Sequence, residues 1–145
     1  MNIENMKAEH IPQIALLEKE CFSSPWSENA LYEELGNPNS HFLSATENGE
    51  VCGYIGVQEI CGEAYITNIA VFENQRGRGI GRALLRKACE DAKIRNCEFI
   101  TLEVRKSNEK AISLYLSEGF EQAGIRKNFY SEPTEDGIIY TKNFM

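Results

Sequence analysis

Apolar residues recur at helical spacing in two segments near the start of the chain. The first segment carries an apolar face that predicts a helix, formed by Ile11, Ile14, Ala15, Leu16 and Leu17. The second is marked by its ends, because Ser27 is a favourable N-cap and Gly36 can end a helix. Trp26 and Leu31 stand at the two positions of a hydrophobic staple around that N-cap. Two helices are therefore expected before the first strands of the main sheet.

Runs of strand character follow, separated by short turns. Residues 42–46 and 51–60 are strand-like, and Asn48-Gly49 between them is the strongest short-range hairpin signal. Cys61-Gly62 turns the chain again into residues 64–72, which are rich in β-branched and aromatic side chains. Three strands joined as a meander are expected here.

The period of the pattern then changes to that of a long helix over about residues 79–95. Its inward face is formed by Ile80, Leu84, Leu85, Ala88 and Ala92. Residues 99–104 follow as a short strand with the character of a buried one. A strand, a long helix and a second strand predict one parallel crossover.

The last third of the chain predicts one helix and two strands. Ser107 or Asn108 caps the helix, and Gly119 stops it. Residues 120–126 and 138–144 are strand-like. Counting an initial strand, the element order predicts a mixed α/β (α+β) fold, with a mostly antiparallel sheet of six to seven strands flanked by about four helices.

Composition and charge narrow the class of protein. The chain has 145 residues, 42% hydrophobic and 26% charged, and shows no repeat and no long linker, so a single domain over residues 1–145 is expected. Its formal net charge is −7. Residues 1–74 carry two basic and twelve acidic side chains, whereas residues 75–145 carry thirteen basic and ten acidic ones. Such a chain is a poor candidate for nucleic-acid binding, while its local basic stretch suggests one small anionic ligand.

Several other classes are not expected. No apolar run approaches the length of a transmembrane helix, and the first residues lack the pattern of a signal peptide. The five cysteines are scattered without a C-x-x-C pair, which favours free thiols in a reducing cytoplasm over disulfides or zinc. With only two histidines as well, no metal site is expected.

A glycine-rich turn lies between a predicted strand and the long helix, and it is formed by Arg76, Gly77, Arg78, Gly79, Ile80, Gly81 and Arg82. Glycines allow close backbone approach and positive φ, and a helix start offers free N–H groups to an anion. An ordinary structural turn is the competing interpretation. The spacing is neither the G-x-G-x-x-G of a dinucleotide fold nor a P-loop. An oligophosphate ligand fits the turn, with the arginines reaching its outer oxygens.

Two residues of the later elements are candidates for proton transfer. Glu103 shares a strand face with Thr101 and Arg105. Burying a carboxylate in a short apolar strand is costly. Glu103 is therefore expected either to form an ion pair with Arg105 or another basic residue, or to act as a general base. Tyr115 lies on the inward face of the following helix, where a purely structural core role is the competing interpretation. Asn108 lies at the start of the same helix, where its structural role would be that of an N-cap.

The run NIAVFENQRGRGIGR, from Asn68 to Arg82, resembles the acetyl-CoA signature of the GNAT N-acetyltransferases. The resemblance implies that Ile69, Ala70 and Val71 pair their backbone with the pantetheine arm. It also implies that the glycine-rich turn wraps the pyrophosphate and that Asn108 hydrogen-bonds the cofactor arm. Acetyl-CoA is then the co-substrate, and no metal takes part.

Three further stretches are similar to the RimI branch of that family: SSPWSENAL, LEVRKSNEKAISLYLSEGF and GIRKNFYSEPTEDGIIYTK. The branch acetylates the N-terminal alanine of a small-subunit ribosomal protein, number eighteen. The resemblance implies Glu103 as the base, Tyr115 as the acid, and Trp26 and Tyr130 as substrate-binding residues. Phe129 departs from the branch, because it replaces the first of two tyrosines. The peptide-side hydroxyl of that tyrosine is therefore absent from this sequence.

The acid–base chemistry of amines favours an α-amine over a lysine as the acceptor of the acetyl group. With pKa values of about 8 and about 10.4, an α-amine and a lysine differ roughly 200-fold in free-amine fraction at pH 7. A different protein N-terminus, a lysine, a small-molecule amine and a non-enzymatic acetyl-CoA sensor stay open as alternatives. The expected protein is cytoplasmic, a monomer or weak dimer, and acts on a protein N-terminus without binding nucleic acid or membrane.

Overall fold

The computed structural model describes residues 1–145 and contains a seven-stranded mixed sheet in the order β1-β2-β3-β4-β5-β7-β6. All neighbouring pairs are antiparallel except β4 and β5, so the predicted fold class and the single parallel crossover are confirmed. The strands are β1 (Asn2–Asn5), β2 (Leu43–Glu47), β3 (Glu50–Ile60), β4 (Glu63–Val71), β5 (Phe99–Arg105), β6 (Glu121–Tyr130) and β7 (Glu135–Asn143).

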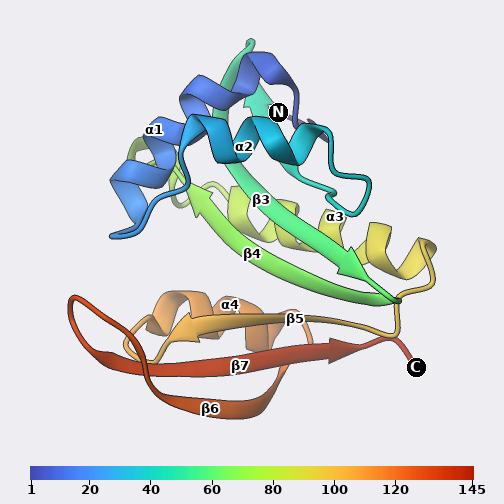
Figure 1. Ribbon diagram of the computed structural model, residues 1–145, viewed down its shortest axis with the longest axis vertical. Coiled ribbons are helices and arrows are strands. Elements are labelled where there is room, and N and C mark those ends of the chain that lie inside the picture. The colour runs from blue at the N-terminus through green and yellow to red at the C-terminus, as the bar shows by residue number, and fades with distance from the viewer.

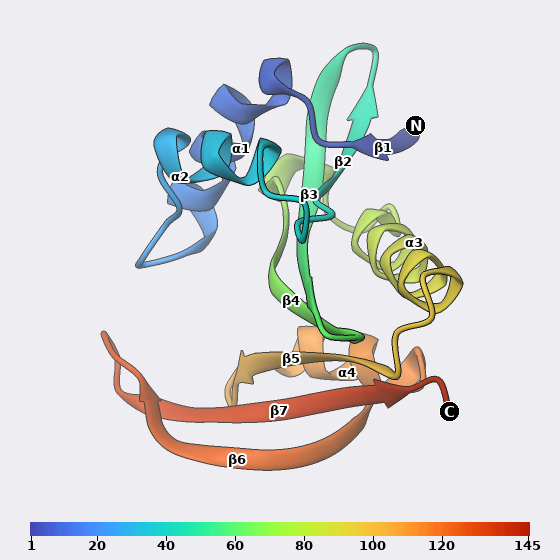
Figure 2. The ribbon, with the colours of Figure 1, turned by 45° about the vertical axis from the view of Figure 1, so that its right-hand side comes forward.

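Helices cover both faces of the sheet. They are α1 (Ile11–Cys21), α2 (Glu28–Leu35), α3 (Ile80–Ile94) and α4 (Glu109–Ser117), with short 3-10 turns at Ala8–His10 and Glu73–Gln75. The helices α1 and α2 lie on one side of β3 and β4, and α3 lies on the other (Figures 1 and 2). The remaining helix, α4, packs against the part of the sheet formed by β5, β6 and β7 (Figure 2). No helix is both long and apolar enough to span a bilayer.

The helix caps and hairpin turns predicted from short sequence patterns are present in the structure. The Ser27 hydroxyl accepts a hydrogen bond from the Ala30 N–H at 3.1 Å, and Gly36 is the C-cap of α2. Asn48-Gly49 and Cys61-Gly62 both have two consecutive positive φ angles, as a two-residue hairpin requires. One prediction of helix facing is wrong: Leu16 is 60% exposed, because it lies between the buried positions Ala15 and Leu17 and points outward.

A β-bulge at Thr67 reverses the facing of β4. Gly56 pairs with Asn68 and Val57 with Ile66, which leaves Thr67 as an extra residue. Before the bulge, Ala64 and Ile66 belong to the core beneath α3. After it, Ile69 and Val71 pack on that core, whereas Ala70 joins the core beneath α1. Asn68, two residues from Ala70, therefore faces the α1 side of the sheet.

The strands β4 and β5 are joined over only three residue pairs. Their parallel register runs from Glu63 and Phe99 to Tyr65 and Thr101, and the strands then diverge (Figures 1 and 2). On the far side of the fork, β6 and β7 extend beyond the ranges predicted for them, up to the pair Tyr130 and Glu135. The fork opens the sheet at the position where the sequence places its candidate chemistry.

Candidate active site

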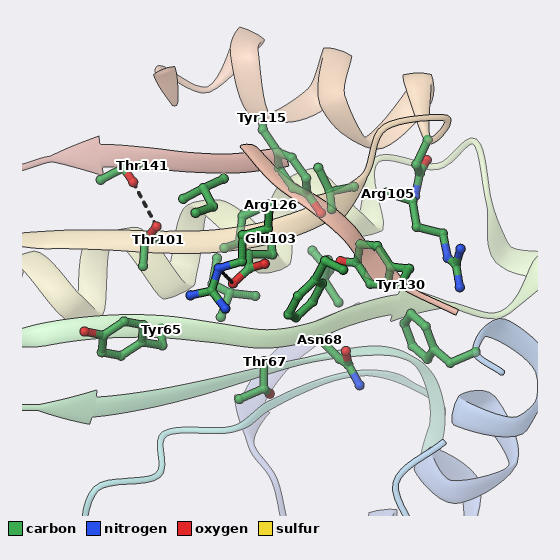
Figure 3. A pocket seen from close by; sticks show the side chains of 18 of the residues that line it. Tyr65, Thr67, Asn68, Thr101, Glu103, Arg105, Tyr115, Arg126, Tyr130 and Thr141 are labelled. Carbon is green, nitrogen blue, oxygen red and sulfur yellow. Dashed lines mark hydrogen bonds and ion pairs between the residues drawn. The ribbon is translucent and has the colours of Figure 1, made fainter. Parts of the chain in front are cut away.

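A cavity of about 1080 Å³ occupies the fork between β4 and β5. Its walls are formed by residues 65–69 of β4, residues 101–105 of β5, residues 21–24 after α1, and residues 129–131 at the end of β6. Side chains from these separate parts of the chain point into one space (Figure 3). The cavity therefore brings together Glu103, Tyr115, Asn108, Ile69 and Tyr130 among the residues singled out in the sequence.

Glu103 presents its carboxylate to this cavity from the middle of β5. The predicted alternation of β5 is present, with Ile100, Leu102 and Val104 buried on the opposite face. Its Oε1 lies 3.4 Å from Nε of Arg126, whereas Arg105 pairs with Glu135 (Figure 3). Its Oε2 is buried and has no hydrogen-bond partner. An unsatisfied buried carboxylate oxygen is costly, and at a cavity wall it is available to a substrate donor.

Tyr115 extends from α4 toward the side of the cavity on which Glu103 and Tyr130 lie (Figure 3). The residue is buried and packs against Phe120 and Tyr140. Burial raises the pKa of its hydroxyl well above the ordinary value, and the nearby Tyr130 raises it further. The phenol therefore stays protonated at neutral pH and can only act there as a proton donor or hydrogen-bonding group.

Asn108 begins α4 at the rim of the same cavity. Its side chain accepts a hydrogen bond from the Ala111 N–H at 3.3 Å, so the N-cap interpretation is confirmed. The residue also lines the cavity. Its Oδ1 is engaged in the cap, which leaves its amide N–H groups for a ligand.

The β6–β7 turn is held against the cavity by Arg105. The guanidinium of Arg105 donates to the carbonyl oxygens of Ser131 (2.9 Å) and Pro133 (2.8 Å) and lies 4.6 Å from the centre of the Tyr130 ring. Burial and the charge of Glu103 raise the pKa of Tyr130. Phe129 packs edge-on against Tyr130, with ring centres 5.0 Å apart. These contacts explain why the strands run further than the sequence predicted.

Trp26 lies outside the cavity lining. Its ring packs edge-on against Phe42 at 5.6 Å, and its backbone N–H donates to Glu18. The neighbouring residues 21–24 line the cavity in its place. The segment after α1 thus borders the cavity, with Trp26 as one of its anchors.

The backbone of β4 faces the fork without a strand partner. The Phe72 N–H donates to the Cys52 carbonyl at 3.0 Å, so the alternation of an antiparallel ladder turns the N–H and C=O groups of Ile69 and Val71 away from β3. Beyond Tyr65 no strand pairs with β4 on that side. An extended ligand with amide groups can therefore hydrogen-bond there like an added strand.

The glycine-rich turn presents free backbone donors at the start of α3. Gly77 and Gly79 have φ angles of 82° and 78°, and Gly79 is the N-cap of the helix. The first hydrogen bond of the helix is donated by the Ala83 N–H to the Gly79 carbonyl, so the N–H groups of residues 77–82 have no acceptor within the chain. No heavy atom lies within 4 Å of where a Cβ on Gly77 or Gly79 would be. An open row of N–H groups at a helix start fits a pyrophosphate.

The arginines around this turn are engaged with the protein. Arg76 donates to the Val71 carbonyl at 3.0 Å, Arg78 pairs with Glu47, and Arg82 pairs with Glu118. Arg82 also lines a second hollow, of about 500 Å³, together with Lys110. The backbone N–H groups of the turn are thus wholly unpaired, whereas each guanidinium group already makes at least one contact within the chain.

Two features of the site were missed in the sequence. Arg126, the partner of Glu103, comes from a strand separated from it by α4, and no local pattern links the two residues. Glu18, which bonds to Asn68 at the cavity wall, is fully buried. A signal for Glu18 existed, because it follows Ile11 and Ala15 on the buried face of α1 at helical spacing.

Comparison with known proteins agrees with this geometry. The sequence profile of the acetyltransferase (GNAT) family matches residues 11–120. The chain therefore belongs to the GNAT family and is an acetyl-CoA-dependent N-acetyltransferase.

Within the family, the chain is of the RimI type. It is 38% identical over 138 residues to a putative [ribosomal protein bS18]-alanine N-acetyltransferase of Bacillus subtilis, covering 94% of this chain and 91% of that protein. It is 36% identical over 135 residues to the [ribosomal protein bS18]-alanine N-acetyltransferase of Escherichia coli K12, covering 93% and 89%. The crystal structure of the ribosomal-protein-S18-alanine N-acetyltransferase from Escherichia coli superimposes with a TM-score of 0.90 at 32% identity, covering 98% and 92%.

Proposed function

We propose that this enzyme, a single domain of the cytoplasm, transfers the acetyl group of acetyl-CoA to the N-terminal alanine of ribosomal protein bS18. The acceptor identity rests on the relatives of the RimI type, which are named for that reaction. The reaction rests on one observation: the carboxylate of Glu103 and the hydroxyl of Tyr115 line the same cavity beside an unpaired strand edge. One space thus holds a proton acceptor, a proton donor and a backbone that can bind an amide-containing arm.

The chain's own groups divide the proton transfers between them. Glu103 accepts a proton from the α-ammonium of the acceptor, directly or through a water, which frees the nitrogen lone pair to form the new C–N bond. A backbone N–H of β4 near Val71 donates to the carbonyl oxygen of the thioester. As the C–S bond breaks, the nitrogen loses its second proton to water and Tyr115 donates its proton to the departing sulfur. Tyr115 is then reprotonated from water.

Cofactor binding divides between two parts of the chain. The free N–H groups of residues 77–82 hold the pyrophosphate, and the outward-facing backbone groups of Ile69 and Val71 pair with the pantetheine arm, whereas those of Ala70 face β3. Asn108 adds a side-chain contact from the start of α4. On this view Arg76, Arg78 and Arg82 reach the phosphates with N–H donors that their present partners do not use, or by exchanging those partners.

The acceptor side is expected to favour a basic peptide. The segment from Ser23 to Gly36, which adjoins the cavity, carries the acidic residues Glu28, Glu33 and Glu34 and no basic ones. Opposite charge on a peptide downstream of its alanine would speed association and lower KM at low salt. If KM is insensitive to salt and to acidic-for-basic replacements in the peptide, this part of the proposal is wrong.

The central experiment is steady-state kinetics of Glu103→Gln and Tyr115→Phe with an alanine-starting peptide that has the N-terminal sequence of bS18. Each variant should lose about 10²–10⁴ in kcat with acetyl-CoA affinity retained. The loss in Glu103→Gln should shrink as pH rises toward the pKa of the α-amine, about 8, because the free amine then needs no base. Glu121→Gln and Tyr32→Phe, which change exposed side chains outside the cavity, are the matched controls. Full activity of Glu103→Gln would refute its role as the base.

Parallel acceptor panels test the substrate class. Peptides with alanine, serine or an acetylated N-terminus, an internal lysine peptide and a set of small primary amines are compared by kcat/KM. Turnover of small amines with none of the peptides would overturn the protein acceptor while leaving the cofactor chemistry intact. Tight acetyl-CoA binding without transfer to any acceptor would instead indicate a sensor.

A further inference from the structure

Glu18 is the most deeply buried charged residue of the chain and takes no part in the proposed proton transfers. It lies on α1 with 0% of its surface exposed, and no cation pairs with it. Burying an unpaired carboxylate is expensive, and such a group is retained where its hydrogen bonds are satisfied and its position matters. Its partners therefore identify its role.

Three neutral donors surround this carboxylate. Its Oε1 accepts from the Trp26 backbone N–H at 2.9 Å, and its Oε2 accepts from the Tyr54 hydroxyl at 2.6 Å. The side-chain amide nitrogen of Asn68 lies 3.1 Å from Oε1 and 3.0 Å from Oε2. Burial has the largest effect and raises the pKa of Glu18 above its ordinary value, although the three hydrogen bonds act in the opposite direction. One carboxylate thus ties α1 to the segment after it and to β4.

The carboxylate fixes the orientation of the Asn68 amide. All three neighbours donate to this carboxylate, and because the NH₂ group of Asn68 faces both oxygens of Glu18, its Oδ1 faces the other way. In Figure 3 the amide nitrogen of Asn68 lies on the side away from Tyr130, and the carbonyl oxygen lies on the side toward it. Asn68 lines the cavity, and its Oδ1 has no hydrogen-bond partner in the chain. The cavity wall therefore carries a neutral acceptor with an enforced direction.

The position of this acceptor indicates which ligand it meets. The bulge at Thr67 turns the Asn68 side chain to the α1 side of β4, where residues 21–24 form the wall. The backbone edge of β4, by contrast, faces the fork and suits the cofactor arm. A lone carbonyl oxygen on the α1 side suits an N–H donor from the other substrate.

Resting on the proposed function, we infer that Asn68 Oδ1 accepts a hydrogen bond from the amino-terminal residue of the acceptor, and that buried Glu18 is the positioning residue that fixes this oxygen toward the acceptor. The pair would then determine acceptor binding while leaving acetyl-CoA binding unaffected. Because Glu18 also holds the Trp26 backbone, it sets the position of the α1–α2 segment relative to the same oxygen.

The test exchanges the hydrogen-bond donor and acceptor between residues 18 and 68. Asn68→Ala removes the oxygen and should raise the peptide KM about tenfold with little change in kcat, the size expected for one hydrogen bond. Glu18→Gln keeps the shape but supplies an NH₂ group, so Asn68 can turn its own NH₂ toward the cavity, and KM should rise similarly. Combining Glu18→Gln with Asn68→Asp reverses the pair, with the donor now at residue 18 and an acceptor oxygen of residue 68 again facing the cavity. The double variant should return KM to within about threefold of the wild type.

Controls separate this inference from the proposed function and from a folding defect. Acetyl-CoA affinity by calorimetry and the thermal midpoint are measured for every variant, and Asn2→Ala makes the matched change at an exposed side chain of β1 outside the cavity. If the wild type does not acetylate the peptide, the proposed function fails. If it does, an unchanged KM in Asn68→Ala refutes the acceptor contact. A double variant no better than either single one, although folded and able to bind acetyl-CoA, refutes the positioning role of Glu18.

Discussion

Two glycines of the glycine-rich turn should respond in opposite ways to the same substitution. Gly79 has φ 78° and ψ 15°, in the left-handed region, as the N-cap of α3. Gly81, two residues on, lies in the first turn of the helix, and its φ is not positive. A methyl group on Gly79 would meet no atom within 4 Å, and one on Gly81 would lie 3.9 Å from Leu114 and Val71, an ordinary contact. Space is therefore sufficient at both positions, and backbone conformation decides the outcome.

The magnitudes follow from conformation alone. An L-residue in the left-handed region costs about 1–2 kcal/mol, so Gly79→Ala should lower the free energy of unfolding by that amount. Replacing a helical glycine with alanine stabilises by about 0.4–1 kcal/mol, so Gly81→Ala should raise it. For a chain of this length each kcal/mol moves the thermal midpoint by about 2–4 °C. The two variants should then differ by about 3–12 °C.

Urea unfolding and differential scanning calorimetry measure the stability, and titration calorimetry measures acetyl-CoA affinity. Relief of the strain in Gly79→Ala tilts the free N–H groups at the start of α3, so its affinity should fall, whereas Gly81→Ala should bind as the wild type does. If both variants shift the midpoint in the same direction, or Gly79→Ala matches the wild type, then conformational strain does not control this turn.

Three further outcomes are expected. Leu84→Ala should lower the free energy of unfolding by about 2–5 kcal/mol in urea titrations, because Leu84 is fully buried in the α3 core. Iodoacetamide at pH 8 should label exposed Cys61 long before buried Cys89, because burial raises the pKa of the Cys89 thiol to about 11. Peptide mass spectrometry measures the order of labelling, and early labelling of Cys89 would contradict the prediction. Hydrogen bonding to Arg86 lowers the pKa of Glu118, so this carboxylate stabilises the fold above its unfolded pKa of about 4.5 and the effect is lost as pH falls through the lower folded value. Glu118→Gln should therefore be less stable than the wild type at pH 7 and equal to it in the most acidic buffers in which both remain folded.

The features that the sequence predicts well depend on neighbours within a few residues. The Ser27 cap, the Asn48-Gly49 turn and the alternation around Glu103 each act locally, and each is present in the structure. The overall fold class follows from the order of such elements. The resemblance of the glycine-rich turn to an acetyl-CoA signature then carries most of the functional prediction.

Features set by distant parts of the chain could not be predicted in this way. The insertion of β7 between β5 and β6 depends on which strands find each other in space. The bulge at Thr67 depends on pairing with Gly56, and the partner of Glu103 arrives from β6. The buried state of Glu18 also depends on Tyr54 and Asn68, which are distant in sequence.

The short seam between β4 and β5 has a consequence for how the protein avoids association with other chains. Beyond Tyr65 the seam leaves β4 as an edge strand inside the sheet, and unpaired edges readily recruit strands of other molecules. Here residues 21–24 and 129–131 line the same cavity as this edge, so the edge strand of a second sheet would have to pass between them to pair with it. The two cavity walls thereby limit strand pairing at an edge of β4 that would otherwise promote aggregation. No charged residue or proline is needed on that edge, and residues 66–71 contain none.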